Sequence, residues 1–176
     1  LETAPVVLLG LADAATVIAE ARTLLRLAIA SETAGQVAAC CDLSVDYAKT
    51  RHQFGRPIGG FQAVKHACAD MFVAAQATSA AVAAAYASWF DEPGHRDLVA
   101  PATIAYALRA GFDVAASTMQ IHGGIAFTAE AMPQLYLKRA KAAQLLAGGV
   151  DATTDWLAAA ILDGATDPLA PILGRP

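Results

Sequence analysis

The sequence predicts an all-α fold, an antiparallel up-and-down helical bundle. Apolar residues and alanines recur at helical spacing along most of the chain, and segments with the composition of strands are few. Glycine and proline pairs interrupt these stretches at Pro93-Gly94, Gly123-Gly124 and Gly148-Gly149. Because the interruptions are short, we expect consecutive helices to pack as antiparallel neighbours.

The first two expected helices are long. Apolar residues step at helical spacing through residues 14–50, and Gly35 within this stretch is expected to permit a close contact with another helix. The second helix is expected over residues 61–90, and it should end before Pro93-Gly94.

Three further helices complete the expected bundle. The third should span residues 97–122, with Pro101 in its first turn, where a missing N–H costs little. A fourth is expected from about residue 130 to 146, with the carboxylate of Glu130 favoured at its positive N-terminal end. The fifth should begin after Gly148-Gly149 and end near Gly164. Residues 165–176 read as a proline-rich tail.

The composition indicates one helical core with apolar surface to cover. The chain has 176 residues, enough for a single core, and 56% of them are hydrophobic. Alanine-rich helices expose little polar surface, so much of the apolar surface must be covered by something else. We therefore expect a homo- or hetero-oligomer, a dimer or tetramer.

Several function classes are not expected. The net charge is −4 and the basic residues form one short cluster, which argues against a nucleic-acid partner. Charged residues interrupt the first long segment, and no segment is expected to span a membrane. The start lacks a basic leader, and a cytoplasmic location is expected. Three cysteines at no metal-ligand spacing indicate reduced thiols and no metal site: Cys40, Cys41 and Cys68.

The connector after the first helix is the most informative segment. Arg51 to Gln62 reads RHQFGRPIGGFQ and concentrates basic side chains in an acidic chain. Guanidinium groups hold phosphates in bidentate fashion, and glycines let the backbone come close, so the connector favours an anion site. The alternative is a helix–helix turn with a solvated basic edge. The basic cluster comprises Lys49, Arg51, His52, Arg56 and Lys65.

Two further segments point to a known family. Gln120 to Glu130 reads QIHGGIAFTAE, and Pro133 to Lys141 reads PQLYLKRAK. Together with the connector, in this order and spacing, they resemble the carboxy-terminal helical domain of the acyl-CoA dehydrogenases. The resemblance runs from about Ala14 to Gly164. It implies that residues 1–13 are the tail of a missing middle β-domain and that residues 14–164 form the helical bundle domain.

The resemblance implies an FAD site shared between subunits. Arg51 matches the arginine that reaches the FAD pyrophosphate in a neighbouring subunit, although Phe54 and Phe61 in isolation would read as core packing. Arg26 matches an arginine near the phosphate end of the acyl-CoA, with a surface arginine as the equal alternative. His52 and His122 read as loop and cap histidines rather than ligands. The other implied cofactor contacts are Gln53, Phe54, Ile58, Phe61, Val64, Gln120, Gly123 and Gly124.

The catalytic base that the family requires is absent. Acyl-CoA dehydrogenases remove the α-proton of the thioester with a glutamate, which one subgroup places before the last helix and another places on the first helix. The matching residues are Ala147 and Leu25, and neither side chain can accept a proton. Asp151 is a weak substitute, since it lies four residues beyond Ala147 and a one-turn shift moves a group by about 5 to 6 Å.

Three functional hypotheses follow. The GGIAFTAE and LYLKRAK segments resemble actinobacterial members that pair unlike subunits on steroid and other bulky acyl-CoA thioesters. The first hypothesis is a base-lacking subunit of such an FAD-dependent acyl-CoA dehydrogenase. The second is a flavin monooxygenase, or another flavoenzyme on the same fold, which needs no α-proton base. The third is a helical domain that serves only in assembly.

Overall fold

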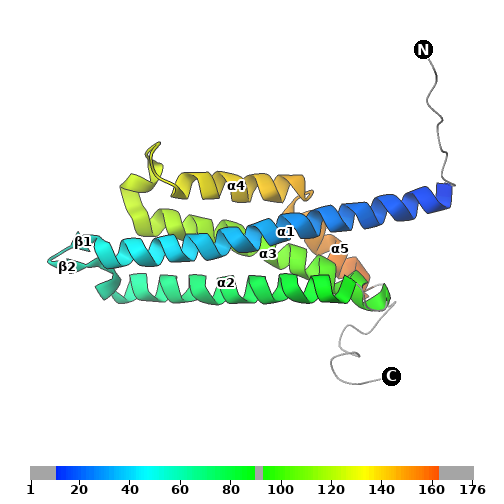
Figure 1. Cartoon of the computed structure of the whole chain (residues 1–176), viewed down its shortest axis with the longest axis horizontal. Helices are drawn as coiled ribbons and strands as arrows, with labels where there is room; N and C mark the ends of the chain where they lie inside the picture. Colours follow the sequence, from blue (N-terminus) through cyan, green and yellow to red (C-terminus); the bar gives the residue numbers. More distant parts are fainter. Residues whose placement is uncertain (1–10, 90–92, 163–176) are drawn as a thin grey trace, which may run out of the picture.

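In the part of the chain that the structure describes, five α-helices form a bundle, which confirms the predicted all-α class (Figure 1). The computed structural model describes residues 11–89 and 93–162. Within these residues the strands are limited to one short hairpin. The elements are α1 (Leu11–Thr50), β1 (His52–Gln53), β2 (Arg56–Pro57), the 3-10 turn η1 (Ile58–Gly60), α2 (Gln62–Trp89), α3 (Pro93–His122), the 3-10 turn η2 (Gly123–Phe127), α4 (Pro133–Leu146) and α5 (Val150–Leu162).

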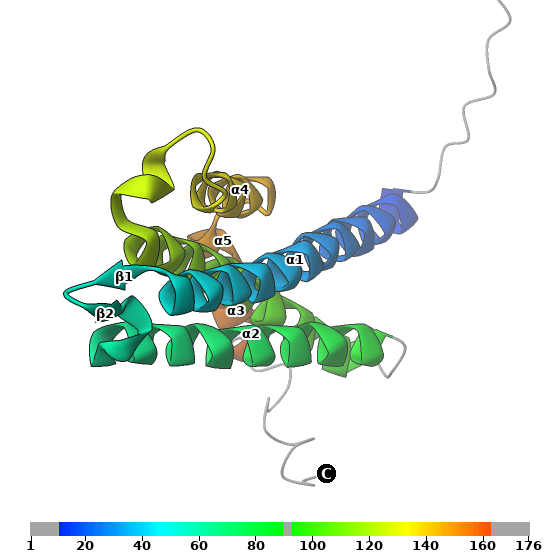
Figure 2. The same ribbon diagram turned by 60° about the vertical axis from the view of Figure 1, so that its left-hand side comes forward.

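The three long helices α1, α2 and α3 pack against one another, and α4 and α5 pack on α3. Figures 1 and 2 show the β1–β2 hairpin and the turn from α3 into η2 at the same end of the bundle. The connector and the Gly123-Gly124 turn are therefore brought together in space, although about 70 residues separate them. This end of the molecule holds the candidate site.

Some helix boundaries differ from the expected ones. Pro93 begins α3, whereas the sequence pattern placed the start near Asp97, because proline is also well suited to the first helical position. Pro101 consequently lies inside α3 and is fully buried, not in the first turn as predicted. Glu130 was predicted to lie at the start of α4, but the helix begins at Pro133 with Met132 at its N-cap.

Most predictions for the two ends of the chain stay predictions, because the structure describes only part of these segments. The helix α1 begins at Leu11, three residues before the expected start. The rest of the proposed β-domain tail, residues 1–10, lies outside the described residues. The same holds for the last two residues of the expected fifth helix and for the tail over residues 165–176.

The core is built from two clusters of small and medium apolar side chains. Small residues allow helix axes to approach closely, so the bundle is tight without large aromatics at its centre. One cluster joins α1, α2, α3, α4 and the α4–α5 turn through Leu27, Ile29, Ala30, Ala85, Ala100, Ile104, Ala107, Leu108, Ala143 and Ala147. The second lies nearer the hairpin and contains Val37, Cys40, Cys41, Met71, Ala75, Val114, Ala115 and Ala140.

The glycine that permits the closest helix contact is Gly111, not Gly35. A side chain at Gly111 of α3 would overlap the methyl group of Thr33 on α1. Gly35 is exposed, and nothing lies within 4 Å of the position a side chain would take there. The sequence-based prediction for Gly35 was therefore wrong, because the sequence pattern marks a glycine without saying which face it occupies.

Polar contacts tie α4 and α3 to α1. Arg139 of α4 makes a bidentate ion pair with Glu32 of α1, and this guanidinium lowers the pKa of the Glu32 carboxyl. Deeper in the bundle, the Thr118 hydroxyl lies 3.3 Å from the Ser44 hydroxyl. Burial raises the pKa of the Cys40 thiol to about 11. All three cysteines are free, as predicted.

The prediction that no segment is long and apolar enough to cross a membrane was wrong. The helix Gln62–Trp89 and the segment Leu98–Phe127 both meet that test of length and composition. The prediction relied on charged residues in α1, whereas α2 carries none from Met71 to Trp89. Core helices of soluble proteins pass the same test, and 56% of the apolar window of Leu98–Phe127 is buried inside the bundle. The corresponding share for α2 is only 17%.

Candidate functional site

The connector between α1 and α2 forms a two-stranded hairpin with a strained tip. His52 pairs with Pro57, and Gln53 pairs with Arg56. The two tip residues, Phe54 and Gly55, both have positive φ, at 52° and 77°, which matches a type I′ turn. A bulky residue in this conformation is uncommon. The tip therefore presents the Phe54 side chain to solvent, where it is 91% exposed.

A cavity of about 430 Å³ lies between this hairpin and the end of α3. Five of the residues predicted to contact a cofactor line it, and they come from two segments far apart in the sequence. Arg51, Gln53 and Ile58 belong to the connector, whereas Gly123 and Gly124 belong to the η2 turn. The remaining lining residues are Tyr47, Ile121, His122 and Ile125.

The cavity is suited to an anionic group with phosphates. Arg51 is exposed, and among the described residues its guanidinium has no ion-pair partner, so its donors remain available. On the facing wall, nothing lies within 4 Å of where side chains at Gly123 and Gly124 would project. Gly123 has a φ of 63°, a conformation that glycine adopts readily. A planar cation and an open glycine backbone therefore share one cavity.

Sequence reasoning missed four residues that line this cavity, and two of them, Tyr47 and His122, contact each other. The ring of Tyr47 stacks on that of His122, with centroids 4.3 Å apart and planes 19° from parallel. The carbonyl of Thr118 accepts a hydrogen bond of 2.8 Å from Nδ1 of His122, which therefore carries a proton. His122, expected as a cap histidine, is buried and forms part of the cavity wall. Tyr47 follows the helical pattern of α1, and nothing in the sequence marks it.

The other predicted cofactor contacts lie outside this cavity. Phe61 packs edge-on against Phe54 at 6.1 Å, and the Arg56 guanidinium lies 4.0 Å from the Phe61 ring centroid. Val64 lines a separate cavity of about 230 Å³ between α1 and α2, next to Lys49 and Lys65. Gln120 is exposed near the end of α3. None of these residues lines the main cavity.

Of the two positions matched to the catalytic base, Ala147 lies at the corner between α4 and α5, and Leu25 lies on α1. Ala147 is the C-cap of α4 and is 2% exposed, whereas Leu25 of α1 is 59% exposed. Gly148 and Gly149 both have a φ of 96°, and their N–H groups donate to the carbonyls of Leu145 and Gln144. This is a Schellman motif, which ends the helix and caps its last carbonyls.

Asp151 and Arg26 take different places at this corner. Asp151 is exposed in the first turn of α5, and the glycine turn separates it from α4. Asp151 and Ala147 therefore do not lie on one helix, as the argument from their spacing assumed. Arg26 is half-buried: its Nε donates to the Ala147 carbonyl at 3.0 Å, and its guanidinium lies 5.4 Å from the Trp156 ring centroid. Its Nη groups make no hydrogen bond within the described residues.

No group of three potential metal ligands lies within the described residues.

Comparison with known proteins identifies related chains. The family model for the acyl-CoA dehydrogenase C-terminal domain matches residues 15–162. The acyl-CoA dehydrogenase IpdE2 of Mycolicibacterium smegmatis is 40% identical over 144 residues, which is 78% of this chain and 39% of that protein. IpdE2 of Mycobacterium tuberculosis is 41% identical over 139 residues, which is 78% of this chain and 38% of that protein. The chain thus spans less than half the length of these relatives.

Solved structures agree with this comparison. The ChsE4–ChsE5 complex from Mycobacterium tuberculosis aligns with a TM-score of 0.76 at 26% identity, covering 82% of this chain and 39% of that one. The Tcur3481–Tcur3483 steroid ACAD variant also aligns with a TM-score of 0.76, at 29% identity, covering 81% of this chain and 39% of that one.

Proposed function

Because this chain belongs to the acyl-CoA dehydrogenase family through its C-terminal helical domain, we propose that it is part of an FAD-dependent enzyme that dehydrogenates acyl-CoA thioesters. The observation that carries the proposal is the cavity in which Arg51 and Gln53 face Gly123 and Gly124. The residue types in this cavity match the connector and the glycine segment that hold the cofactor in the family.

The residues present fit FAD. Arg51 would hold the pyrophosphate, Gln53 and Gln120 would donate hydrogen bonds, and Gly123 and Gly124 leave room for the dinucleotide backbone. Held by these residues, FAD would supply the acceptor for the hydride that leaves the β-carbon of the acyl group. Phe54 at the hairpin tip is 91% exposed, which supports a cofactor held between this chain and a neighbouring subunit. Ile58, Phe61 and Val64 would complete the apolar surroundings.

This subunit does not supply the α-proton base. Ala147 is apolar and buried in the core, and Leu25 is apolar and exposed. Asp151 lies beyond the glycine turn on another helix. We therefore infer a base-lacking subunit whose partner, a glutamate-bearing homologue, performs proton abstraction. The similar solved structures ChsE4–ChsE5 and Tcur3481–Tcur3483 are each named for two proteins, which is consistent with such pairs.

The acyl-CoA contact of Arg26 belongs to the same proposal. Its Nε is committed to the Ala147 carbonyl, but the Nη groups keep donors for a phosphate or carbonyl oxygen. Arg26 would therefore hold the α4–α5 corner in place and contact substrate through its other nitrogens. We also propose that the whole protein is a cytoplasmic enzyme of fatty acid or steroid catabolism, by analogy with the relatives found above.

The test is to co-purify the full-length protein with its glutamate-bearing homologue and count flavins per subunit. Bound FAD that is reduced by an acyl-CoA thioester without oxygen supports the proposal. FAD that is reduced only by another donor and reacts with oxygen favours a flavin monooxygenase. An assembly that holds no flavin at all would favour a purely structural domain and contradict the assignment of the cavity.

A further inference from the structure

His122 is fixed in the wall of the hairpin-end cavity by two contacts, and one of its ring nitrogens takes part in neither. The residue is only 8% exposed, and its ring stacks on that of Tyr47. Its Nδ1 donates a hydrogen bond of 2.8 Å to the carbonyl of Thr118. Its Nε2 makes no hydrogen bond with any described residue. The stack and the Nδ1 bond therefore orient the ring and leave Nε2 for a ligand.

The Nε2 atom of His122 keeps access to the cavity. Among the described residues, no fully buried side-chain nitrogen or oxygen lacks a hydrogen-bond partner. Since Nε2 has no partner there, it is not fully buried, and the small exposed part of His122 includes this atom. His122 lines the cavity, so a ligand in the cavity can reach Nε2. A neutral imidazole with its proton on Nδ1 carries a lone pair on Nε2, which accepts a hydrogen bond.

The support behind His122 is itself buried. The side chain of Thr118 is fully buried, and its hydroxyl donates to the Val114 carbonyl at 2.9 Å. The same hydroxyl lies 3.3 Å from the hydroxyl of Ser44 on α1. An acceptor held in this way loses little side-chain freedom when a ligand binds, which favours a contact that discriminates between ligands.

We propose that Nε2 of His122 accepts a hydrogen bond from a hydroxyl of the adenosine ribose of the cofactor, an inference that rests on the proposed function of this cavity. The guanidinium of Arg51 has only donors, which suit phosphate oxygens and leave ribose hydroxyls without an acceptor. In the adenosine half of FAD the ribose lies between the pyrophosphate and the adenine ring. The apolar side chains of Ile58, Ile121 and Ile125 line the same cavity and suit such a ring.

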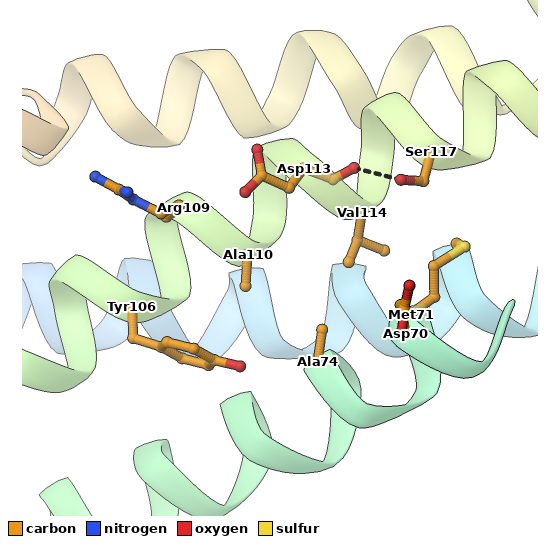
Figure 3. A pocket seen from close by; sticks show the side chains of 9 residues that line it. All are labelled: Asp70, Met71, Ala74, Tyr106, Arg109, Ala110, Asp113, Val114 and Ser117. Atoms are coloured by element: carbon orange, nitrogen blue, oxygen red, sulfur yellow. Dashed lines mark hydrogen bonds between the residues drawn. The ribbon is translucent and has the colours of Figure 1, made fainter. Parts of the chain in front are cut away.

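The cavity between α2 and α3 contains no comparable group. It measures about 240 Å³, and its buried lining residues are apolar: Met71, Ala110 and Val114 (Figure 3). The hydroxyl of Ser117 is already bonded to the Asp113 carbonyl. The charged residues that line it are all exposed: Asp70, Arg109 and Asp113. A buried, oriented nitrogen therefore distinguishes the hairpin-end cavity from this groove.

The test measures nucleotide binding by calorimetry on the full-length protein, assembled with its partner and freed of flavin. The probes are ADP and 2′,3′-dideoxy-ADP. We expect the wild type to bind the dideoxy compound about tenfold more weakly, because one hydrogen bond is lost and Nε2 stays unpaired. His122→Asn can still donate to the Thr118 carbonyl but does not extend to the Nε2 position. It should bind both probes with the lower affinity.

Two further variants separate this contact from a structural role. His122→Gln places an amide oxygen near the Nε2 position, so it should restore part of the preference for ADP. A residue that only supports the fold would not recover a preference between two ligands. The matched control is His66→Asn on α2, because His66 is exposed and does not line the cavity. This control should bind both probes as the wild type does.

The contradicting outcomes are distinct. Equal affinity of the wild type for ADP and dideoxy-ADP overturns the inference, and this measurement needs no variant. A loss of inorganic pyrophosphate binding in His122→Asn also overturns it, since His122 would then contact phosphate. A loss of riboflavin 5′-phosphate binding in that variant would place Nε2 on the other half of FAD and overturn it as well. Binding of FAD without discrimination between the ADP probes contradicts this inference alone, whereas a protein that binds neither FAD nor ADP contradicts the proposed function too.

Discussion

At the scale of single residues, Arg51 is the side chain on which the cofactor assignment depends most. It lies on the cavity with a guanidinium that no carboxylate of the described residues neutralises. Arg51→Ala should lower the flavin content of the assembled enzyme by weakening binding by about 1.5–3 kcal/mol, the usual contribution of a charge-assisted hydrogen bond. Flavin absorbance per subunit after purification measures this change.

Arg51→Lys provides the control for geometry. A lysine keeps the charge but cannot make the bidentate contact, so it should restore flavin binding only in part. Unchanged flavin content in Arg51→Ala would contradict the assignment of this cavity to the pyrophosphate.

The hairpin tip offers a second prediction at this scale. Phe54 adopts a positive φ of 52°, which costs a non-glycine residue roughly 1–2 kcal/mol. Phe54→Gly should therefore raise the free energy of unfolding by about 1 kcal/mol, while the loss of the exposed ring lowers flavin occupancy. Gly55→Ala, at the neighbouring positive φ, should destabilise the protein instead. Denaturant unfolding, with bound flavin measured on the same samples, tests both variants. A Phe54→Gly protein that is less stable than the wild type would contradict the argument that the positive φ of Phe54 costs stability.

At the scale of elements, the closest packing lies between α1 and α3. Gly111→Ala adds a methyl group that overlaps the Thr33 side chain, and overpacking of this kind costs about 1–3 kcal/mol. This exceeds the gain of about 1 kcal/mol in helix propensity, so the net effect should be destabilising. Gly35→Ala is the matched control: its side chain enters open space and should stabilise the protein by up to about 1 kcal/mol. Thermal unfolding of both variants measures the difference, and equal effects would refute the packing argument.

The packing of the α4–α5 corner determines whether a glutamate introduced at Ala147 could act as the base. Ala147 is buried in the core cluster, so Ala147→Glu should destabilise the chain by about 3 kcal/mol or more and give little activity. Leu146→Glu, one residue earlier and 63% exposed, should change stability by no more than about 0.5 kcal/mol. Unfolding midpoints and acyl-CoA oxidation are measured for both. An active Ala147→Glu protein of normal stability would mean that the corner opens toward a substrate.

At the scale of the whole molecule, the lack of a base predicts catalytic silence. General bases contribute about 10²–10⁴-fold to rate, so the full-length protein alone should oxidise acyl-CoA at a negligible rate even with flavin bound. Mixed with a glutamate-bearing homologue, it should give active enzyme with about one productive site per pair. Turnover per flavin is the measurement. Robust turnover by this chain alone would point to an unrecognised base, and Asp151→Asn would be the first variant to examine.

The proposed function also requires a partner at the hairpin end of the molecule, where the cavity is proposed to share a cofactor with a homologous subunit. The apolar composition that predicted an oligomer includes α2, in which only 17% of the most apolar window is buried.

The sequence by itself determined the helical class, the order of five helices, the glycine turns and the absence of a glutamate at Ala147 and Leu25. These features are local, since helical periodicity, turn residues and residue identity are read over a few positions. Only the tertiary structure decided that Arg51 and Gly123 share one cavity with Tyr47 and His122. It also decided that Gly111 is the close-contact glycine and that Arg26 bonds to the Ala147 carbonyl. The physical reason is that these contacts join residues many turns apart, and packing between helices, not periodicity along one helix, selects which side chains meet.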